Sequence, residues 1–502
     1  MSRRRRSFAF TLRPRPTGTP AYRWVSDALR SDILEGRLRP GALLPSTRDL
    51  ARSYKLARGT IVSAFEQLRA EGYVSGSIGS GTFVSKILPD ELLQVAKRKN
   101  AAQASQAGAR VQLAKFASRA RAFPPFDLRP ARAFRANQPA LDLFPTTLWA
   151  QTASRRARKA TTNMLLGCPP FGYRPLQDAV ADYLTTSRGV RCVPEQIAIV
   201  AGVQEALTLS VSVVLNPGER VCIENPGYVG AALVCEAFGA QLVSVDVDDE
   251  GMRLPDSRTR RVKLAYVTPA HQYPSGVVMS LTRRLALLDW ARRAGALILE
   301  DDYDGEYRYA GRPVPALQGL DRQHVVLFAG SFSKVLFPSL RLGYVVVPEW
   351  LVEPFAAAIS LTTRHAPLLE QAVLADFMAD GHFGRHVRRM REVYAERRTV
   401  LLEEAERHLS DLLEISGIEA GLQTAAWLRR GVSGAEVAKA AAKRDVEVAS
   451  LGRYFRGPPQ REGLHIGFAA VDTQEIRRGV RELAQVLEQT FRVTRRRTGG
   501  TK

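Results

Sequence analysis

A lysine and an arginine lie close together in the fourth hundred residues of the chain, among small and hydroxyl side chains. An apolar run over residues 325–328 leads into Ala329-Gly330-Ser331-Phe332-Ser333-Lys334, and Arg341-Leu342-Gly343 begins seven residues after the lysine. A lysine amine can condense with a carbonyl group, while serine and arginine side chains donate to anionic oxygens. The segment 331–343 is therefore the first candidate for a chemical site.

Three other apolar runs also end in polar residues. Residues 296–299 lead into Glu300-Asp301-Asp302-Tyr303-Asp304, residues 220–223 into Glu224-Asn225-Pro226-Gly227-Tyr228, and residues 196–200 into Ala201-Gly202-Val203-Gln204, where a helix begins. Ligands of open α/β sheets bind beyond the carboxyl ends of the strands. We therefore expect these four segments to converge on one site.

The elements that position these residues follow from the pattern of apolar runs. Seven runs rich in β-branched residues alternate with helical stretches, at 196–200, 220–223, 241–245, 264–267, 296–299, 325–328 and 342–347. Buried strands that alternate with helices predict an α/β fold with a mostly parallel sheet, covered by helices on both faces.

In this order, and over nearly all of residues 127–490, the motifs resemble those of the fold-type I aminotransferases, which bind pyridoxal 5'-phosphate (PLP). The resemblance implies that Lys334 forms the Schiff base with PLP and that a carboxylate, Asp301 or alternatively Asp302, pairs with the pyridine nitrogen. Strand alternation puts Tyr303 on the side of Asp301, within reach of the ring's O3'. Tyr228 resembles the aromatic residue that stacks on the ring. The implied phosphate donors are Ser331, Arg341 and the backbone N–H groups of Gly202, Val203 and Gln204.

Two segments depart from the aminotransferase pattern. His465, in Gly463-Leu464-His465-Ile466-Gly467-Phe468, stands where many relatives have an arginine that holds an amino acid's carboxylate. An imidazole is a poorer carboxylate partner than a bidentate guanidinium. His271-Gln272-Tyr273-Pro274-Ser275-Gly276 replaces the usual Asn-Pro-Thr-Gly. Both departures argue against efficient transamination, with at most a half-reaction expected, and make His465 the candidate effector-binding residue.

The pattern of residues 20–86 predicts a second, smaller domain. Helical periodicity covers about 22–35, 46–54 and 59–71, with Ser46 as a cap, and two short strands at 73–75 and 82–84 flank a glycine-rich turn. This order is that of a winged helix-turn-helix, which places one helix end in the major groove of DNA.

The segments 44–51 and 79–84 resemble those of the GntR family of transcription regulators, and with the large domain the whole chain resembles its MocR subfamily. The resemblance implies DNA contacts at the start of the second helix, at the start of the third helix and in the wing. The candidate residues are Ser46, Thr47, Arg48, Arg58, Gly59, Thr60, Ser80, Gly81 and Thr82. Ala57 replaces a serine that is usual before the third helix, which removes a side-chain cap worth about 1 kcal/mol. Arg58 is expected to contact either a base edge or a phosphate.

Charge is concentrated at the N-terminal end of the chain. Residues 1–86 hold 16 Lys and Arg against 6 Asp and Glu, and residues 87–126 hold 7 against 2. This asymmetry favours a polyanionic partner such as a double-stranded DNA operator. The basic segment 87–126 is poor in large apolar residues and is expected to be a flexible linker with a frayed helix around 92–98.

Four cysteines without metal-ligand spacing, and the lack of a signal-peptide core or a long apolar run, predict a cytoplasmic protein without a bound metal. We expect a PLP-dependent transcription regulator that forms a homodimer, head-to-tail as the resemblance implies, and that senses PLP, an amine or an amino acid. Two alternatives are an aminotransferase with an accessory DNA-binding module and a DNA-binding protein whose large domain only dimerises. The operator, the effector and the direction of regulation stay open at this stage.

Overall fold

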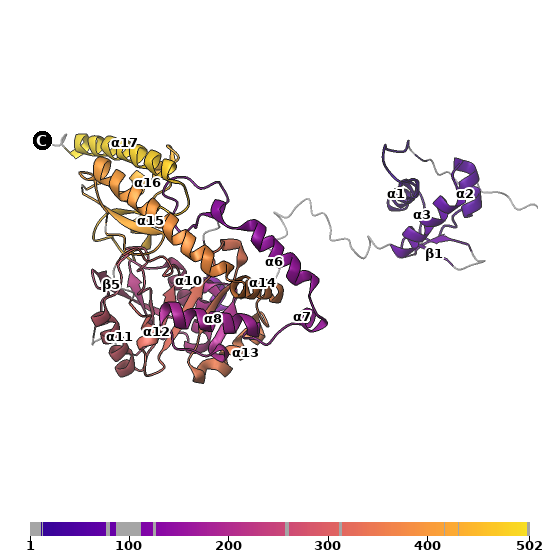
Figure 1. Cartoon of the computed structure of the whole chain (residues 1–502). Coiled ribbons are helices and arrows are strands. Elements are labelled where there is room, and N and C mark those ends of the chain that lie inside the picture. Colours follow the sequence, from indigo (N-terminus) through magenta and orange to yellow (C-terminus); the bar gives the residue numbers. More distant parts are fainter. Residues whose placement is uncertain are drawn as a thin grey trace, which may run out of the picture. The chain divides into compact units, whose positions relative to one another are not determined.

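The structure is a computed structural model, and it describes residues 12, 14–76, 81–86, 112–123, 127–256, 261–310, 314–415, 417–429 and 431–498. The chain divides into two compact units, Met1–Val111 and Gln112–Lys502 (Figure 1). Each has its own buried core.

The small unit is a winged helix-turn-helix, as predicted. It contains α1 (Ala21–Leu34), α2 (Thr47–Tyr54), α3 (Arg58–Ala70), β1 (Val74–Ser75) and β2 (Phe83–Val84), and the two strands pair antiparallel. The three helices bury their periodic apolar residues against one another, among them Val25, Leu29, Ile33, Leu50, Ile61, Phe65 and Leu68.

Helix α2 is bounded by two local signals. The Ser46 hydroxyl accepts a hydrogen bond from the Asp49 backbone N–H at 3.2 Å, and Lys55 ends the helix in the left-handed conformation. Helix α3 begins after Ala57, which provides no side-chain cap, as the sequence predicted. The first backbone N–H groups of α3 therefore lack a side-chain acceptor.

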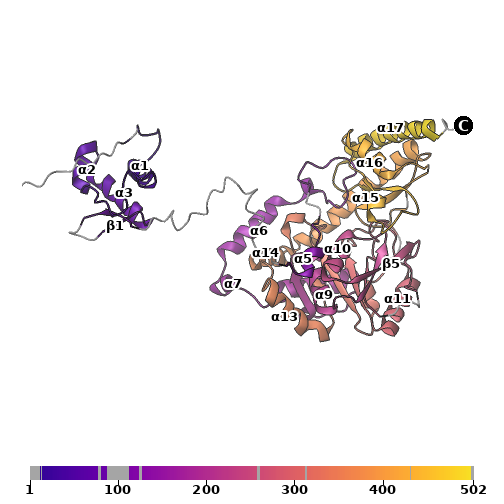
Figure 2. The ribbon, with the colours of Figure 1, turned by 180° about the vertical axis from the view of Figure 1, so that it is seen from behind.

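A short helix, α5 (Lys115–Arg119), precedes the large sheet and packs against α10 (Val229–Phe238), as Figure 2 shows. The rings of Phe116 and Phe238 meet edge to face, with centroids 5.4 Å apart. Part of the segment expected to be a flexible linker thus carries a helix seated on the large unit. The helix expected around 92–98 lies outside the described residues.

The large unit is built on an eight-stranded sheet in the order β3-β10-β9-β8-β7-β4-β5-β6. Strands β5, β4, β7, β8 and β9 run parallel, and β10 is antiparallel to both of its neighbours. All seven predicted strands are present, and β6 is a two-residue addition at the edge. The strands are β3 (Ile197–Val200), β4 (Arg220–Asn225), β5 (Gln241–Asp248), β6 (Gly251–Met252), β7 (Val262–Val267), β8 (Leu297–Asp302), β9 (Val326–Ser331) and β10 (Gly343–Val346).

Helices cover both faces of this sheet, as predicted. One face packs against α9 (Val203–Val214), α10 and α13 (Val352–Thr362). The other packs against α8 (Arg174–Arg188), α11 (Leu281–Ala294), α12 (Leu317–Leu320) and α14 (Leu368–Ala379). Two further helices, α6 (Thr146–Arg158) and α7 (Thr162–Leu166), precede α8.

A second, four-stranded antiparallel sheet near the C-terminus was not predicted. Its order is β11-β12-β14-β13, and its core also contains α15 (His382–Leu409), α16 (Gly434–Ala442) and α17 (Thr473–Thr498), with α15 and α17 side by side (Figure 1). The strands are β11 (Leu413–Ile415), β12 (Gln423–Leu428), β13 (Ala449–Ser450) and β14 (Gly463–Gly467). Among the helices that the structure describes, none has the length and apolar composition needed to cross a membrane.

Candidate functional site

The predicted site residues meet at the carboxyl edge of the large sheet. Ser331 ends β9, Asp301 lies in β8, and Tyr228 follows β4. Burial and the charge of Asp301 raise the pKa of Tyr228, and the charge of Arg341 lowers it. The charge of Asp301 also raises the pKa of Lys334. The four separated segments therefore form one cluster.

Lys334 lies three residues beyond β9, and its amine is partly desolvated. Its Nζ donates a hydrogen bond to the backbone carbonyl of Asn137 at 2.5 Å. Burial lowers the pKa of Lys334 to about 8, against the opposing charges of Asp304 and Asp301. An amine with a lowered pKa has a larger neutral, nucleophilic fraction at physiological pH.

The structure distinguishes between the two candidate carboxylates. Asp302 accepts hydrogen bonds from Arg188 at 2.6 Å and from the backbone of Gly305. Asp301 projects to the other face of β8, where its Oδ2 accepts from the Tyr266 hydroxyl at 2.6 Å. Its Oδ1 is buried and has no hydrogen-bond partner among the described residues. Burial raises the pKa of Asp301 to about 7.

The two candidate tyrosines have defined partners. The Tyr303 hydroxyl lies 3.0 Å from Nδ1 of His271, and the same nitrogen lies 3.0 Å from Asp304 Oδ1. The Tyr228 hydroxyl donates to Oε1 of Gln204 at 3.2 Å. Both phenols are buried beside the carboxyl ends of the strands.

The candidate phosphate donors lie around Gly202. This glycine precedes α9 with φ of 100°, and a Cβ placed on it would lie 3.6 Å from the Arg341 guanidinium. β10 carries Gly343 opposite both Val200 and Ser331, so Ser331 lies near the start of α9. The first N–H groups of a helix, a serine hydroxyl and a guanidinium form a donor set that suits a dianionic phosphate.

His465 lies in β14 and is fully buried. Its Nδ1 lies 3.1 Å from the Tyr454 hydroxyl, and its Nε2 has no partner among the described residues. Burial lowers the pKa of His465 to about 3, so the imidazole is neutral at physiological pH.

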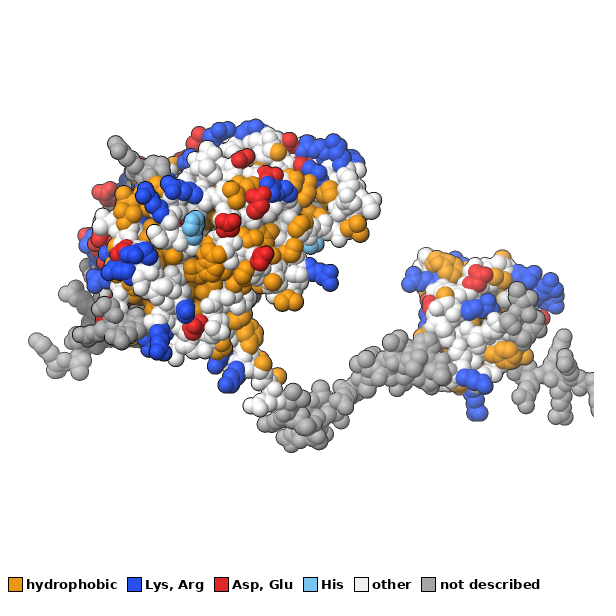
Figure 3. Space-filling model, turned by 90° about the horizontal axis from the view of Figure 1, so that it is seen from below, with side chains coloured by type: hydrophobic (Ala, Val, Ile, Leu, Met, Phe, Trp, Pro, Cys, Tyr) orange, Lys and Arg blue, Asp and Glu red, His pale blue; other side chains and the backbone are white. Residues whose placement is uncertain are grey.

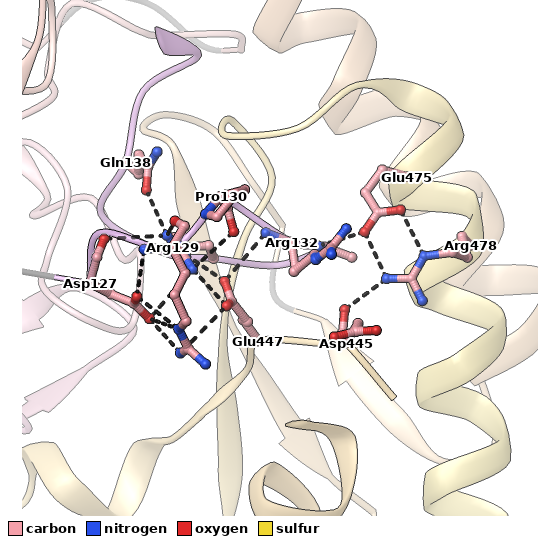
Figure 4. Close-up of polar contacts among 11 residues, drawn as sticks. Asp127, Arg129, Pro130, Arg132, Gln138, Asp445, Glu447, Glu475 and Arg478 are labelled. Atoms are coloured by element: carbon pink, nitrogen blue, oxygen red, sulfur yellow. Dashed lines mark hydrogen bonds and ion pairs between the residues drawn. The ribbon is translucent and has the colours of Figure 1, made fainter. Parts of the chain in front are cut away.

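An irregular segment with turns, residues 127–138, brings Asn137 to Lys334 and is called the N-terminal strap here. Figure 4 shows Glu447 among the polar residues of the strap, next to Arg129 and Arg132. The buried guanidinium of Arg135 donates to Glu447 at 2.7 Å. Farther along Figure 4, Glu475 accepts from the strap's backbone at Ala133 and pairs with Arg478.

The residues present fit PLP. The orphaned Oδ1 of Asp301 can accept a hydrogen bond from a protonated pyridine nitrogen, Lys334 offers an amine, and the donors around Gly202 offer a place for a phosphate.

Several residues of this cluster were not predicted. They are Asn137, Tyr266, Tyr273, Gln423 and Tyr454. Tyr273 lies in the motif that departs from the aminotransferase pattern. Tyr266 lies within a predicted strand but carried no sign of a role in the site, and Asn137, Gln423 and Tyr454 lie in segments without a recognised motif.

The candidate DNA-binding residues lie on the small unit. Arg48, Arg58, Gly59 and Gly81 are exposed, whereas Thr47, Thr60 and Thr82 are half-buried. Ser46 is exposed, but its hydroxyl is used in the cap of α2. Ser80 lies outside the described residues. Gly81 has φ of 90°, and a Cβ there would lie 2.7 Å from Leu43, so the wing needs glycine at this position.

Comparison with known proteins assigns both units. Residues 21–84 match the family "Bacterial regulatory proteins, gntR family", and residues 133–483 match "Aminotransferase class I and II". The chain is 38% identical to the probable rhizopine catabolism regulatory protein MocR of Rhizobium meliloti, over 93% of this chain and 94% of that protein. It is 30% identical to the pyridoxine biosynthesis transcriptional regulator PdxR of Corynebacterium glutamicum, over 94% and 96%.

Among solved structures, the large unit resembles LysN, the alpha-aminoadipate aminotransferase of Thermus thermophilus, with a TM-score of 0.68 and 28% identity. That match covers 76% of this chain and 98% of the other. A DNA-binding module of the GntR type and an aminotransferase domain occur together here, as in the MocR protein that matches over nearly its whole length. The chain belongs to the MocR subfamily of the GntR transcription regulators.

Proposed function

We propose that this chain is a PLP-dependent transcription regulator that binds a DNA operator and senses PLP, an amine or an amino acid through Lys334. The observation that carries the proposal is the buried Oδ1 of Asp301, which has no partner in the described parts of the chain and lies near a lysine of lowered pKa. The same chain also has a winged helix-turn-helix. Relatives named as a rhizopine catabolism regulator and a pyridoxine biosynthesis regulator support it.

Each residue of the cluster has a proposed task. When bound, PLP supplies an aldehyde and a ring that withdraws electrons. Lys334 would hold PLP through its amine, and Asp301, oriented by Tyr266, would keep the pyridine nitrogen protonated. Tyr303, fixed by His271, contacts O3', and Tyr228 packs on the ring. Ser331, Arg341 and the start of α9 hold the phosphate.

The small unit is proposed to bind the operator through the exposed ends of α2 and α3 and the wing. Helix α3 starts with Arg58 and Gly59 and has no acidic residue in its first turn, so its free N–H groups and positive end favour phosphate or base contacts.

The proposed assembly is a homodimer, as the family resemblance implies. Figure 3 shows hydrophobic side chains gathered across one face of the large unit. Leu165 and Leu166 of α7 and Leu361 of α13 are 79%, 81% and 87% exposed. A Cβ on Gly167 would lie 2.9 Å from His365, so the end of α7 lies against the loop after α13 and the three leucines share one region.

The decisive experiment measures PLP and DNA binding together. Purified protein incubated with PLP should gain a visible absorption band that Lys334→Ala abolishes and that Lys443→Ala, at an exposed lysine, leaves in place. Operator affinity should change with PLP, and by linkage DNA should change PLP affinity by the same factor. Operator affinity that ignores PLP and every amine would contradict the proposal.

The competing function is an aminotransferase with an accessory DNA-binding module. Amino donors with a keto-acid acceptor should give no sustained turnover if the chain is a regulator. Turnover of about 1 per second or faster, the ordinary range of enzymes, would favour the enzyme instead.

A further inference from the structure

Gln423 in β12 and His465 in β14 form what is called the effector wall here. Asn137 of the strap lies between Gln423 and Lys334. In the β12–β14 pair, Ala425 lies opposite His465. Gln423 is two residues from Ala425 along β12, so Gln423 and His465 project from the same face of this sheet.

Each of these side chains uses one polar atom in a contact with the protein and has a second polar atom that can bind a ligand. Gln423 Oε1 accepts the backbone N–H of Asn137 at 2.8 Å, and His465 Nδ1 lies 3.1 Å from the Tyr454 hydroxyl. Gln423 Nε2 and His465 Nε2 are buried and have no hydrogen-bond partner among the described residues. Buried polar atoms without partners are rare in native proteins, and each calls for a ligand or a water molecule.

A chain of contacts joins this wall to the reactive lysine. Lys334 donates to the Asn137 carbonyl, and the Asn137 side chain donates to the Tyr273 hydroxyl at 3.0 Å. The Tyr273 hydroxyl in turn lies 3.3 Å from that of Tyr454. The amine of Lys334 and the two free nitrogens therefore belong to one site.

The side chains of this wall carry no charge. The Gln423 side chain contacts the Asn137 amide and the Tyr303 phenol, His465 contacts the Tyr454 phenol, and burial keeps the imidazole uncharged. The nearby Arg453 is exposed and stacks on the outer ring of Tyr454, with its guanidinium carbon 5.5 Å from the ring centroid. Lys334 also acts on His465, but its amine is bonded to Asn137. A carboxylate placed against Gln423 and His465 would therefore be buried without a cation in direct contact, which is costly. A hydroxyl group can accept from the amide and pair with either tautomer of the imidazole.

From this juxtaposition we infer that the effector is a primary amine that bears neutral hydroxyl groups where an amino acid bears its carboxylate. The inference rests on the proposed function, because the amine must reach the PLP held at Lys334. Gln423 and His465 are then the residues that select the effector.

The test compares matched amines on the PLP-loaded, full-length protein. Serinol and L-serine differ only in a hydroxymethyl group against a carboxylate, and isopropylamine lacks both. Calorimetry and the change in the visible band should show serinol binding at least about tenfold more tightly than either, the scale of one or two buried hydrogen bonds. Equal or tighter binding of L-serine or isopropylamine, or no difference among the three, would overturn the inference.

Two substitutions locate the preference. His465→Asn keeps a polar atom for Tyr454 but removes Nε2, and should weaken serinol binding about tenfold while leaving isopropylamine binding unchanged. His408→Asn, at an exposed histidine of α15, is the matched control. His465→Arg should reverse the preference in favour of L-serine. If His465→Asn affects all three amines equally, or His465→Arg leaves the preference intact, the assignment of the wall is wrong.

The proposed function and the inference about the effector are contradicted by different results. Protein that holds no PLP at Lys334 contradicts the proposed function and the inference with it. Protein that holds PLP and changes its operator affinity with amines, but prefers L-serine, contradicts the inference alone.

Discussion

Lys334 and Asp301 are coupled through their charges, and this coupling gives a pH dependence. Only the neutral amine captures an aldehyde, so the rate of PLP capture by the PLP-free protein should rise with pH and level off above about 8. Because Asp301 raises the pKa of Lys334, Asp301→Asn should move this midpoint to lower pH. Stopped-flow absorbance across pH 6–10, roughly two units either side of that pKa, measures both profiles.

The control is Asp445→Asn, at an exposed position far along the chain, which should keep the wild-type midpoint. A midpoint that does not fall in Asp301→Asn would mean that the charge of Asp301 does not act on the amine.

At the residue scale, the sequence predicted the reactive groups better than their supports. Lys334, Asp301 and Arg341 lie in contiguous motifs at strand ends, where chemistry is expected from topology alone. Strand alternation already favoured Asp301 over Asp302, and the structure adds that the two acids have different partners, Tyr266 and Arg188. Gln423 contributes through tertiary pairing with Asn137, 286 residues away, and leaves no local pattern.

The start of α3 provides the clearest prediction at the scale of an element. Gly59 is exposed in the first turn, and nothing lies within 4 Å of a Cβ placed on it. Gly59→Ala should therefore keep or slightly raise the thermal stability, since alanine favours helix. If the backbone approaches DNA here, operator binding should weaken by about 1–3 kcal/mol.

Gly384→Ala is the matched control, because Gly384 lies in the first turn of α15 and is equally open. Fluorescence anisotropy with a labelled operator compares the two variants. Unchanged affinity in Gly59→Ala would remove this turn from the interface.

The strap provides a second prediction at this scale. Glu447 accepts charged hydrogen bonds from Arg135, whose side chain is 9% exposed. Glu447→Gln should lower the free energy of unfolding by about 1.5–3 kcal/mol, the range for hydrogen bonds to charged groups. Urea denaturation measures the change, with Glu353→Gln in α13 as the control. An unchanged midpoint would show that the other contacts of Arg135 suffice.

The large sheet was predictable and the small one was not, for a physical reason. Strands buried on both faces are runs of apolar, β-branched residues, such as Ile197–Val200. In the small sheet, Ala449–Ser450 and Leu413–Ile415 are too short for any periodicity to emerge. The longer strands, Gln423–Leu428 and Gly463–Gly467, are interrupted by polar residues or glycine and form no apolar run. Its existence depends on packing against α15 and α17 rather than on local sequence.

The exposed leucines of α7 and α13 lead to a prediction for the whole molecule. If a second copy covers them, Leu165→Asp combined with Leu166→Asp should turn a dimer into a monomer in sedimentation velocity. Leu281→Asp is the control, since α11 lies at the opposite end of the large unit from α7 in Figures 1 and 2. A double variant that stays dimeric places the interface elsewhere.

Asn137, Lys334 and β14 lie far apart along the chain but meet in one site. The site can therefore form only late in synthesis. The winged helix-turn-helix has a core of its own and is complete once residue 84 has been made. The site around Lys334 needs His465, about 380 residues later, which takes on the order of 20–80 s at ordinary rates of translation. Each new chain therefore passes through a period in which the winged helix-turn-helix can fold while the site around Lys334 is still incomplete.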